Sequence, residues 1–248
     1  MAALDSARAT SFGTFAEEYA LWRPTYPDTA VDWLLPPSLD AGAHVADVGA
    51  GTGQLTGLLL ARGLRVSAVE PDCDMLAVLT HLHPGAEPHL ATAESLPFAD
   101  HSLDAVLVGT AWHWFPVEAA VAEVRRVLRP GGRLGLVWNL VRPVADWEHE
   151  LAGTDPDGKG TDHEAFAPPT SFPADEVETT TLPWDWHVSP EQYAGNLATN
   201  TAVRLLEEEA RRRRLDEAAA VVRGACDRAG TATVPVHHEA FCLRWTPA

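Results

Sequence analysis

Between Ala43 and Asn139 the chain alternates short runs of apolar and β-branched residues with longer amphipathic stretches. This alternation is typical of βαβ units, in which helices cover both faces of a parallel sheet and the strands read as nearly continuous apolar runs. Five runs predict strands, and they read HVADVG, LRVSAVE, EPHLAT, LDAVLVGTA and RLGLVWN. A chain of this kind is expected to form an open α/β sheet that binds its ligand at the carboxyl ends of the strands.

Helical patterns separate most of these strands. Residues 54–62 carry four leucines and stop at Gly63, a residue type that commonly follows a helix C-terminus. A second helix is expected from Asp72 to about His81. A third is expected from Val117 to Leu128, where apolar side chains recur at spacings of three and four before RPGG turns the chain into the fifth strand.

The sequence changes character after Asn139. Residues 153–173 hold too many Gly, Pro and Asp residues for a core element, and they predict a surface loop or lid. Beyond them, residues 176–188 predict a sixth strand, residues 190–229 two helices and residues 234–245 a final strand.

Charge and cysteine content exclude several classes of partner. The chain has 18 basic and 35 acidic residues, a formal net charge of −17, which repels a phosphate backbone, so we expect no nucleic-acid partner. Cys73, Cys226 and Cys242 are odd in number and widely spaced, so they predict neither a disulfide framework nor a metal site. No apolar run reaches about 18 residues and the first residues lack a signal-peptide core, so we expect a cytoplasmic protein without a membrane partner.

The loop after the first strand, VADVGAGTGQLT, places three glycines on alternate positions behind Asp47. Glycine lets a ligand approach the backbone closely and adopts left-handed dihedral angles without strain. The G-x-G-x-x-G dinucleotide motif fails in both registers, because Gln54 and Thr56 stand where its last glycine would be. The loop also carries no Lys or Arg for a pyrophosphate. Its carboxylate, Asp47, suits a ligand with an ammonium or sulfonium charge instead.

Glu70 follows Gly53 by seventeen residues, at the end of the second predicted strand. An acidic side chain at this place can accept hydrogen bonds from both hydroxyls of a ribose. A ribose next to a cationic group describes few ligands. With the D-x-G-x-G-x-G run that begins at Asp47, the chain resembles the class I S-adenosylmethionine-dependent methyltransferases.

The resemblance covers roughly residues 14–139 and includes LPF after ATAES, SLDAVLVGTAWHWF and VLRPGGRLGLVWN, which look like later motifs of the small-molecule, type 11-like members. It implies a Rossmann-like, seven-stranded, mostly parallel sheet flanked by helices, with an N-terminal helical lid and a helical cap after strand five. We therefore expect a single domain over residues 1–248, divided into a cofactor-binding core with its lid at 14–139, a substrate-side insertion or cap at 140–233 and a final strand at 234–248.

The resemblance also implies S-adenosylmethionine as the cofactor. Its methionine part would lie near Asp47 and the glycine loop and its ribose on Glu70, while Met75 either flanks the adenine or packs in the core. Where many relatives carry an acidic residue for the adenine amino group, this chain has Thr92, so Glu94, Ser95 or water would replace that contact. The cofactor-binding residues expected on this basis are Asp47, Gly49, Ala50, Gly51, Gly53, Gln54, Glu70, Pro71, Met75, Thr92, Ala93, Glu94 and Thr110.

Aromatic residues gather where the fourth strand leaves the sheet, in GTAWHWF. Aromatic walls exclude water and attract a sulfonium charge. His113 is the candidate general base, since an imidazole titrates near neutral pH, and the alternative is that it only holds the strand end. FGTFAEEYALWRPTYP resembles the family's lead-in, so Tyr19, Arg23 and Tyr26 would close the site, with Arg23 gripping a carboxylate. The alternative is that Tyr19 and Trp22 only dock the helix. The substrate-side residues expected are Tyr19, Arg23, Tyr26, Trp112, Trp114 and Trp138.

The function implied is transfer of a methyl group from S-adenosylmethionine to a small-molecule acceptor, either a natural product or a small carboxylic acid or hydroxyl compound. A carboxylate acceptor would need no general base. A different class of function remains open, in which the protein binds S-adenosylmethionine as a structural or regulatory ligand and transfers no methyl group. The acceptor atom, and the choice between monomer and homodimer, are not determined by the sequence.

Overall fold

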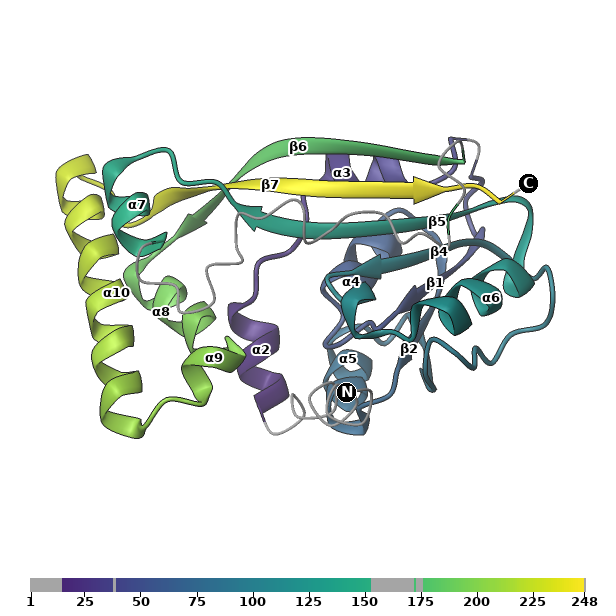
Figure 1. Ribbon diagram of the computed structural model, residues 1–248, viewed down its shortest axis with the longest axis horizontal. Coiled ribbons are helices and arrows are strands. Elements are labelled where there is room, and N and C mark those ends of the chain that lie inside the picture. The colour runs from purple at the N-terminus through teal and green to yellow at the C-terminus, as the bar shows by residue number, and fades with distance from the viewer. Residues whose placement is uncertain (1–14, 38, 153–171, 173–175, 248) are drawn as a thin grey trace.

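The computed structural model of the protein describes residues 15–37, 39–152, 172 and 176–247. Its strands form one mixed sheet (Figure 1). Seven strands lie in the order β3-β2-β1-β4-β5-β7-β6. β7 is antiparallel to both neighbours, and the other pairs are parallel. The strands are β1 His44–Val48, β2 Arg65–Glu70, β3 Glu87–Leu90, β4 Leu103–Gly109, β5 Leu128–Val141, β6 Val177–Val188 and β7 Val234–Trp245. The predicted Rossmann-like, mostly parallel sheet is confirmed.

Helices cover both faces of this sheet. They are α2 Ala16–Trp22, α3 Asp28–Leu34, α4 Gln54–Ala61, α5 Cys73–Leu82, α6 Val117–Val127, α7 Asp146–Ala152, α8 Pro190–Ala198, α9 Thr201–Arg204 and α10 Glu208–Ala229. The three helices predicted between the early strands are confirmed as α4, α5 and α6. The chain leaves α4 through Gly63, whose φ is +72°. No described helix is long and apolar enough to cross a membrane.

Residues 190–229 form three helices, so the prediction of two is wrong. Asn200 causes the extra break, because its side-chain oxygen accepts a hydrogen bond from the Ala202 N–H at 2.8 Å and starts the short helix α9. Ser189 and Gln192 form a reciprocal capping box at the start of α8. The predicted loop at 153–173 lies outside the described residues except for Phe172, which is buried.

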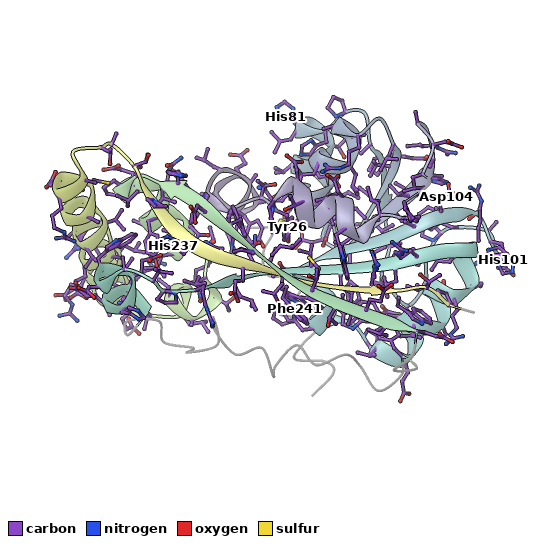
Figure 2. All side chains as sticks on the ribbon, turned by 90° about the horizontal axis from the view of Figure 1, so that it is seen from above. Tyr26, His81, His101, Asp104, His237 and Phe241 are labelled. Atoms are coloured by element: carbon purple, nitrogen blue, oxygen red, sulfur yellow. The ribbon has the colours of Figure 1, made fainter. Side chains whose placement is uncertain are left out.

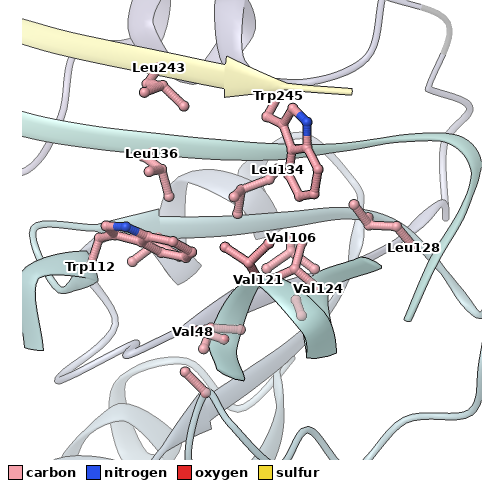
Figure 3. Close-up of a cluster of buried hydrophobic side chains, with 14 of the residues drawn as sticks. Val48, Val106, Trp112, Val121, Val124, Leu128, Leu134, Leu136, Leu243 and Trp245 are labelled. Carbon is pink, nitrogen blue, oxygen red and sulfur yellow. The ribbon is translucent and has the colours of Figure 1, made fainter. Parts of the chain in front are cut away.

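The main core lies between α6 and the sheet (Figure 3). Val121 and Val124 on the inner face of α6 belong to one buried cluster with Val106, Leu134 and Leu136 from strands β4 and β5. A second cluster joins α3 and α4 to the opposite face of the sheet. The α/β part of the molecule is therefore closed on both faces, and its ligand-binding edge is the remaining open side.

Strands β5, β6 and β7 run well beyond the parallel strands and carry α7 to α10 at their far end (Figure 1). We call these four the far-end helices. Their own core includes Val188 and Val236 from the strands and Val222 from α10. The N-terminal helix α2 lies between this group and the α/β part, and Trp22 packs so closely on α8 that a side chain at Gly195 would collide with it. The long strands thus hold a second group of helices beside the open edge.

Leu136 tests the main core. It is fully buried beneath α6, so Leu136→Ala is expected to lower the free energy of unfolding by about 2–5 kcal/mol, through lost transfer energy and the cavity left behind. Urea denaturation measures this. Leu205→Ala is the control, because Leu205 is 74% exposed and its truncation should change stability by no more than about 0.5 kcal/mol. Equal effects of the two variants would contradict the packing described.

Candidate active site

The loop between β1 and α4 lies over the carboxyl ends of β1 and β2. The N–H groups of Gly49 and Ala50 donate to the carbonyl oxygen of Val69 at 2.8 and 3.1 Å, which ties the loop to the end of β2. Gly49, Gly51 and Gly53 all have positive φ angles, of +69°, +55° and +95°. The alternate glycines are therefore needed for a left-handed path that other residues would adopt only with strain.

The three glycines differ in what surrounds them. A Cβ on Gly49 would lie 2.6 Å from the Cβ of Ala111, and one on Gly53 would collide with the ring of His83. A Cβ on Gly51 would meet no atom within 4 Å. At Gly49 and Gly53 a side chain is therefore excluded by neighbouring residues, whereas Gly51 faces open space that a ligand can fill.

Asp47 ends β1 as a buried carboxylate. Its Oδ2 accepts a hydrogen bond from the Thr56 hydroxyl at 2.6 Å, and its Oδ1 is buried without a hydrogen-bond partner in the described part of the chain. Burial, together with the smaller effect of the Glu70 charge, raises the pKa of Asp47 to about 7 despite the hydrogen bond from Thr56. A buried acceptor without a donor is costly, so Asp47 Oδ1 is suited to a donor or cation brought by a ligand.

Glu70 lies close by at the end of β2, 6% exposed. Its Oε2 accepts from the Gly51 N–H at 2.8 Å and its Oε1 from the Asp72 N–H at 3.0 Å. Burial raises the pKa of Glu70 to about 7 despite these two bonds. Each carboxylate oxygen retains a further lone pair, so Glu70 can hold the loop and still accept bonds from ligand hydroxyls.

A cavity of about 100 Å³ opens beside Gly51. It is lined by Tyr19, Gly49, Gly51, Glu70, Pro71, Met75, Gly109, Thr110, Ala111, Trp114 and Phe115. Eight of these are residues named from the sequence, whereas Gly109, Ala111 and Phe115 were missed. A nucleoside-sized ligand commonly needs about 300 Å³ or more, so part of it would lie outside this enclosed space or displace a lining side chain.

The adenine side of the expected site is formed only in part. Pro71 and Met75 line the cavity, and Met75 is also buried against the fold. Asp72 starts α5 by accepting from the N–H groups of Asp74 and Met75. Thr92, Ala93 and Glu94 are not among the lining residues; Ala93 is buried and Glu94 is exposed.

Residues of α2 and the segment after it connect the site to its surroundings. The Tyr26 hydroxyl and Thr110 Oγ1 form a hydrogen bond of 2.9 Å, and a side chain at Gly109 would lie 2.6 Å from the Tyr26 oxygen. Thr110 itself has a φ of +53°, a strained angle that this contact supports. Gln54, expected among the cofactor contacts, donates through Nε2 to the carbonyl oxygen of Ala20 at 3.0 Å.

Arg23 points from the end of α2 toward the far-end helices. Its guanidinium carbon lies 4.9 Å from the centre of the Tyr19 ring, and Nη2 donates to the carbonyl oxygen of Thr199 at 3.4 Å. Its Nε is buried without a hydrogen-bond partner in the described part of the chain. Arg23 therefore joins a cavity-lining aromatic residue to the segment between α8 and α9.

The aromatic residues after β4 occupy different environments. Trp112 is buried and packs on Phe115 and Phe172, while Trp114 is half-buried and lines the cavity. The ring of His113 is exposed and lies 4.6 Å from that of Trp114. Trp138, on β5, is buried against Phe241. Of the five aromatic residues named for the substrate side, Tyr19 and Trp114 line the cavity.

Comparisons with known proteins agree with this geometry. Residues 46–136 match a family described as a methyltransferase domain. An uncharacterized methyltransferase of Mycobacterium tuberculosis is 52% identical over 141 residues, which are 57% of this chain and 57% of that protein. An uncharacterized methyltransferase of Schizosaccharomyces pombe is 34% identical over 139 residues, 55% of each chain. The chain thus spans little more than half the length of these curated relatives.

A solved structure extends the likeness beyond the matched region. It is described as a proposed type II methyltransferase from Anaeromyxobacter dehalogenans, and it superposes with a TM-score of 0.65 at 28% identity over 90% of this chain and 96% of that one. The fold and the glycine-loop site resemble those of Rossmann-like methyltransferases. The chain is similar to the class I S-adenosylmethionine-dependent methyltransferases, over residues 46–136 by its sequence and over most of its length by its fold.

The glycine loop generates a test by paired substitution. Gly51→Ala should cost only the left-handed conformation, about 1–2 kcal/mol of unfolding free energy. Gly49→Ala should cost at least about 1 kcal/mol more, because its Cβ must displace Ala111. Chemical denaturation of both variants decides the matter, and identical losses would show that the two glycines have the same environment.

Proposed function

We propose that this protein transfers a methyl group from S-adenosylmethionine to a small-molecule acceptor. One observation carries the proposal: the open backbone of Gly51 follows the buried carboxylate Asp47 in the loop and donates its N–H to the buried carboxylate Glu70, at the carboxyl ends of adjacent strands. An uncompensated pair of buried carboxylates favours a ligand that brings both positive charge and hydrogen-bond donors. The amino-acid, sulfonium and ribose groups of S-adenosylmethionine supply these features.

When bound, S-adenosylmethionine supplies an electrophilic methyl group, and the chain's own residues orient and enclose the reactants. Asp47 Oδ1 would accept from the cationic part and Glu70 from the ribose hydroxyls. Pro71 and Met75 would flank the adenine. Tyr19, Trp114 and Phe115 would exclude water and present aromatic faces to positive charge. Orientation and desolvation of this kind account for a large part of catalysis in group transfer.

The acceptor is proposed to be a natural product or a small carboxylic acid or hydroxyl compound. A malonyl-[acyl-carrier protein] O-methyltransferase of Methylococcus capsulatus is 40% identical over 98 residues. A ubiquinone/menaquinone biosynthesis C-methyltransferase of Rubrivivax gelatinosus is 36% identical over 95 residues. These relatives methylate different kinds of atom by name, so the likeness supports a small acceptor without selecting the atom. We also propose a cytoplasmic location, which the free cysteines among the described residues favour.

Calorimetric titration of the purified protein with S-adenosylmethionine, S-adenosylhomocysteine and NAD tests the proposal. We expect the first two ligands to bind at one site and NAD not to bind. A panel of carboxylic acids and phenols should then yield S-adenosylhomocysteine with at least one acceptor. Saturable NAD binding in place of the other two ligands would refute the assignment.

The second candidate function is cofactor binding without methyl transfer. The fold is also that of a protein named a [4+2]-cyclase, with a TM-score of 0.51 at 20% identity, so the fold alone does not determine the reaction. Tight S-adenosylmethionine binding with no S-adenosylhomocysteine formed across a broad acceptor panel would favour this alternative.

The raised pKa values predict how ligand affinity depends on pH. A cation placed at Asp47 stabilises the ionised carboxylate, so binding below pH 7 must release the proton that burial retains. The affinity for S-adenosylmethionine should therefore rise by up to about tenfold per pH unit from about pH 5.5 to pH 7 and level off above that. Calorimetry at several pH values measures it.

Two controls accompany this measurement. Uncharged 5′-methylthioadenosine should bind with much weaker pH dependence, and Asp47→Asn should flatten the dependence for S-adenosylmethionine. An affinity that falls as the pH rises would contradict the placement of the cationic group at Asp47.

For His113 we propose that the imidazole positions Trp114, because His113 is exposed and its ring contacts that of Trp114 at 4.6 Å and an angle of 46°. His113→Ala should then lower kcat by less than about tenfold with the acceptor found in the screen, whereas loss of a general base costs about 10²–10⁴-fold. A loss in that higher range, with disappearance of one limb of the pH–rate profile, would establish His113 as the base.

A further inference from the structure

A second cavity lies at the amino edge of the sheet, opposite the glycine loop. Its volume is about 380 Å³, and it lies where β1, β2 and β4 begin. It is lined by His44, Arg65, Ser67, Glu87, His89, Pro97, Phe98, Ala99, Ser102 and Arg129. Figure 2 shows Asp104, which adjoins this cavity through Arg129, near the end of the molecule remote from His237. The site proposed for methyl transfer shares none of these lining residues.

The lining reverses the charge balance of the chain as a whole. The protein carries 18 basic and 35 acidic residues, yet this cavity is lined by two arginines, two histidines and one carboxylate. Arg65 Nη2 forms an ion pair with Glu87 Oε2 at 3.0 Å, and Arg129 Nη1 forms one with Asp104 Oδ1. A guanidinium has five N–H donors in a planar fork, so each arginine retains donors beyond those ion pairs.

Two imidazoles, of His44 and His89, add further polar groups to the lining. His44 Nε2 lies 2.9 Å from Ser67 Oγ. Burial lowers the pKa of His44, and the charges of Arg65 and Arg129 lower it further, while those of Glu87 and Asp104 oppose them. His89 Nε2 is buried without a hydrogen-bond partner in the described part of the chain, and the nearest carboxylate oxygen, on Glu87, is 3.9 Å away. An anion would supply the acceptor that His89 lacks.

An apolar wall completes the cavity. The ring of Phe98 lies edge-on to His89 at 5.2 Å and to His44 at 6.0 Å, with Pro97 beside it in the chain. The volume exceeds what a lone oxyanion fills and falls within the usual range of small-molecule sites, about 300–1,000 Å³. The cavity thus offers cationic donors together with room and apolar surface for an organic group.

We propose that this amino-edge cavity binds a small molecule through an oxyanion, a phosphate monoester above all, at a site separate from that of methyl transfer. The guanidinium fork matches the oxygens of a phosphate group in two parallel hydrogen bonds, and the aromatic wall contacts the organic part. Cations are disfavoured here by Arg65 and Arg129. Glu87 lies in the same cavity and opposes the anion, so the affinity should be moderate, with a dissociation constant on the order of 0.1–1 mM.

Calorimetry and NMR titration at low ionic strength provide the test, with inorganic phosphate, ribose 5-phosphate and neutral ribose as probes. Both phosphates should bind saturably at one site and shift the imidazole signals of His44 and His89, while ribose should not. Tighter binding of ribose 5-phosphate identifies a phosphorylated metabolite as the ligand, and equal affinity identifies free phosphate. The proposal is overturned if neither of the two phosphates binds at concentrations up to about 10 mM.

Variants that remove a charge distinguish a specific anion site from non-specific electrostatic attraction. Arg65→Gln and Arg129→Gln should each weaken phosphate binding by about five- to tenfold, the effect expected of a lost charge-assisted hydrogen bond. Arg142→Gln is the matched control, because Arg142 is similarly exposed and also pairs with one carboxylate, Glu239, far from this cavity. An equal loss in the control would show that only net charge matters and would refute the site.

For two further changes, the proposal predicts the direction in which the affinity for the anion shifts, and a purely structural role for these residues does not. Glu87→Gln should tighten phosphate binding, because it removes the opposing charge and releases Arg65. Sulfate, whose charge is constant in this range, should bind more tightly as the pH falls from about 8 to about 6, because the anion stabilises the protonated form of His44, whose pKa burial lowers in the free protein. The charged groups that act on His44 are Glu87, Asp104 and the two arginines. Weaker binding by Glu87→Gln together with a flat sulfate profile would overturn the proposal.

Discussion

The burial of two carboxylates at the ends of β1 and β2 is the constraint on which the site depends. Glu70 bonds the N–H groups of Gly51 and Asp72, so it sets the path of the glycine loop and the start of the segment that leads into α5. Asp72 in turn caps that helix. Asp47 holds Thr56 within the first turn of α4. Two acidic side chains therefore help to position the starts of α4 and α5, and they do so at an electrostatic cost that a cationic ligand would relieve.

The far-end helices matter because they bring a second wall to the open edge of the sheet. Strands β5, β6 and β7 extend past the parallel strands and support these helices, as Figure 1 shows. Helix α2 then lies between the two groups, held by Trp22 on one side and Gln54 on the other. The hydrogen bond between Tyr26 and Thr110 ties the segment after α2 to the turn that carries Trp114. Changes in the far-end helices can therefore reach the cavity through contiguous packing.

The two edges of the sheet have opposite electrostatic character. The carboxyl edge presents Asp47 and Glu70 and suits a cation, whereas the amino edge gathers Arg65, Arg129 and two histidines. Because β1 and β2 begin at one edge and end at the other, the same two strands would connect an anion site to the methyl-transfer site. The separation of charge along these strands is a property of the folded sheet, since the residues concerned are spread over many positions in the chain.

Local patterns determined much of this protein. Strand and helix periods, the stop at Gly63 and the D-x-G-x-G-x-G run were sufficient to predict the sheet, its parallel core and the loop with Asp47 and Glu70 at the strand ends, because these features depend on neighbouring residues. The sequence did not reveal that protein packs against Gly49 and Gly53 while Gly51 faces open space, or that Gln54 and Arg23 bind other parts of the chain. It likewise did not show that Gly109 and Phe115 line the cavity. These outcomes depend on contacts between residues far apart in the chain, such as Gly53 with His83 and Tyr26 with Thr110, and only the tertiary structure decides which side chains meet there.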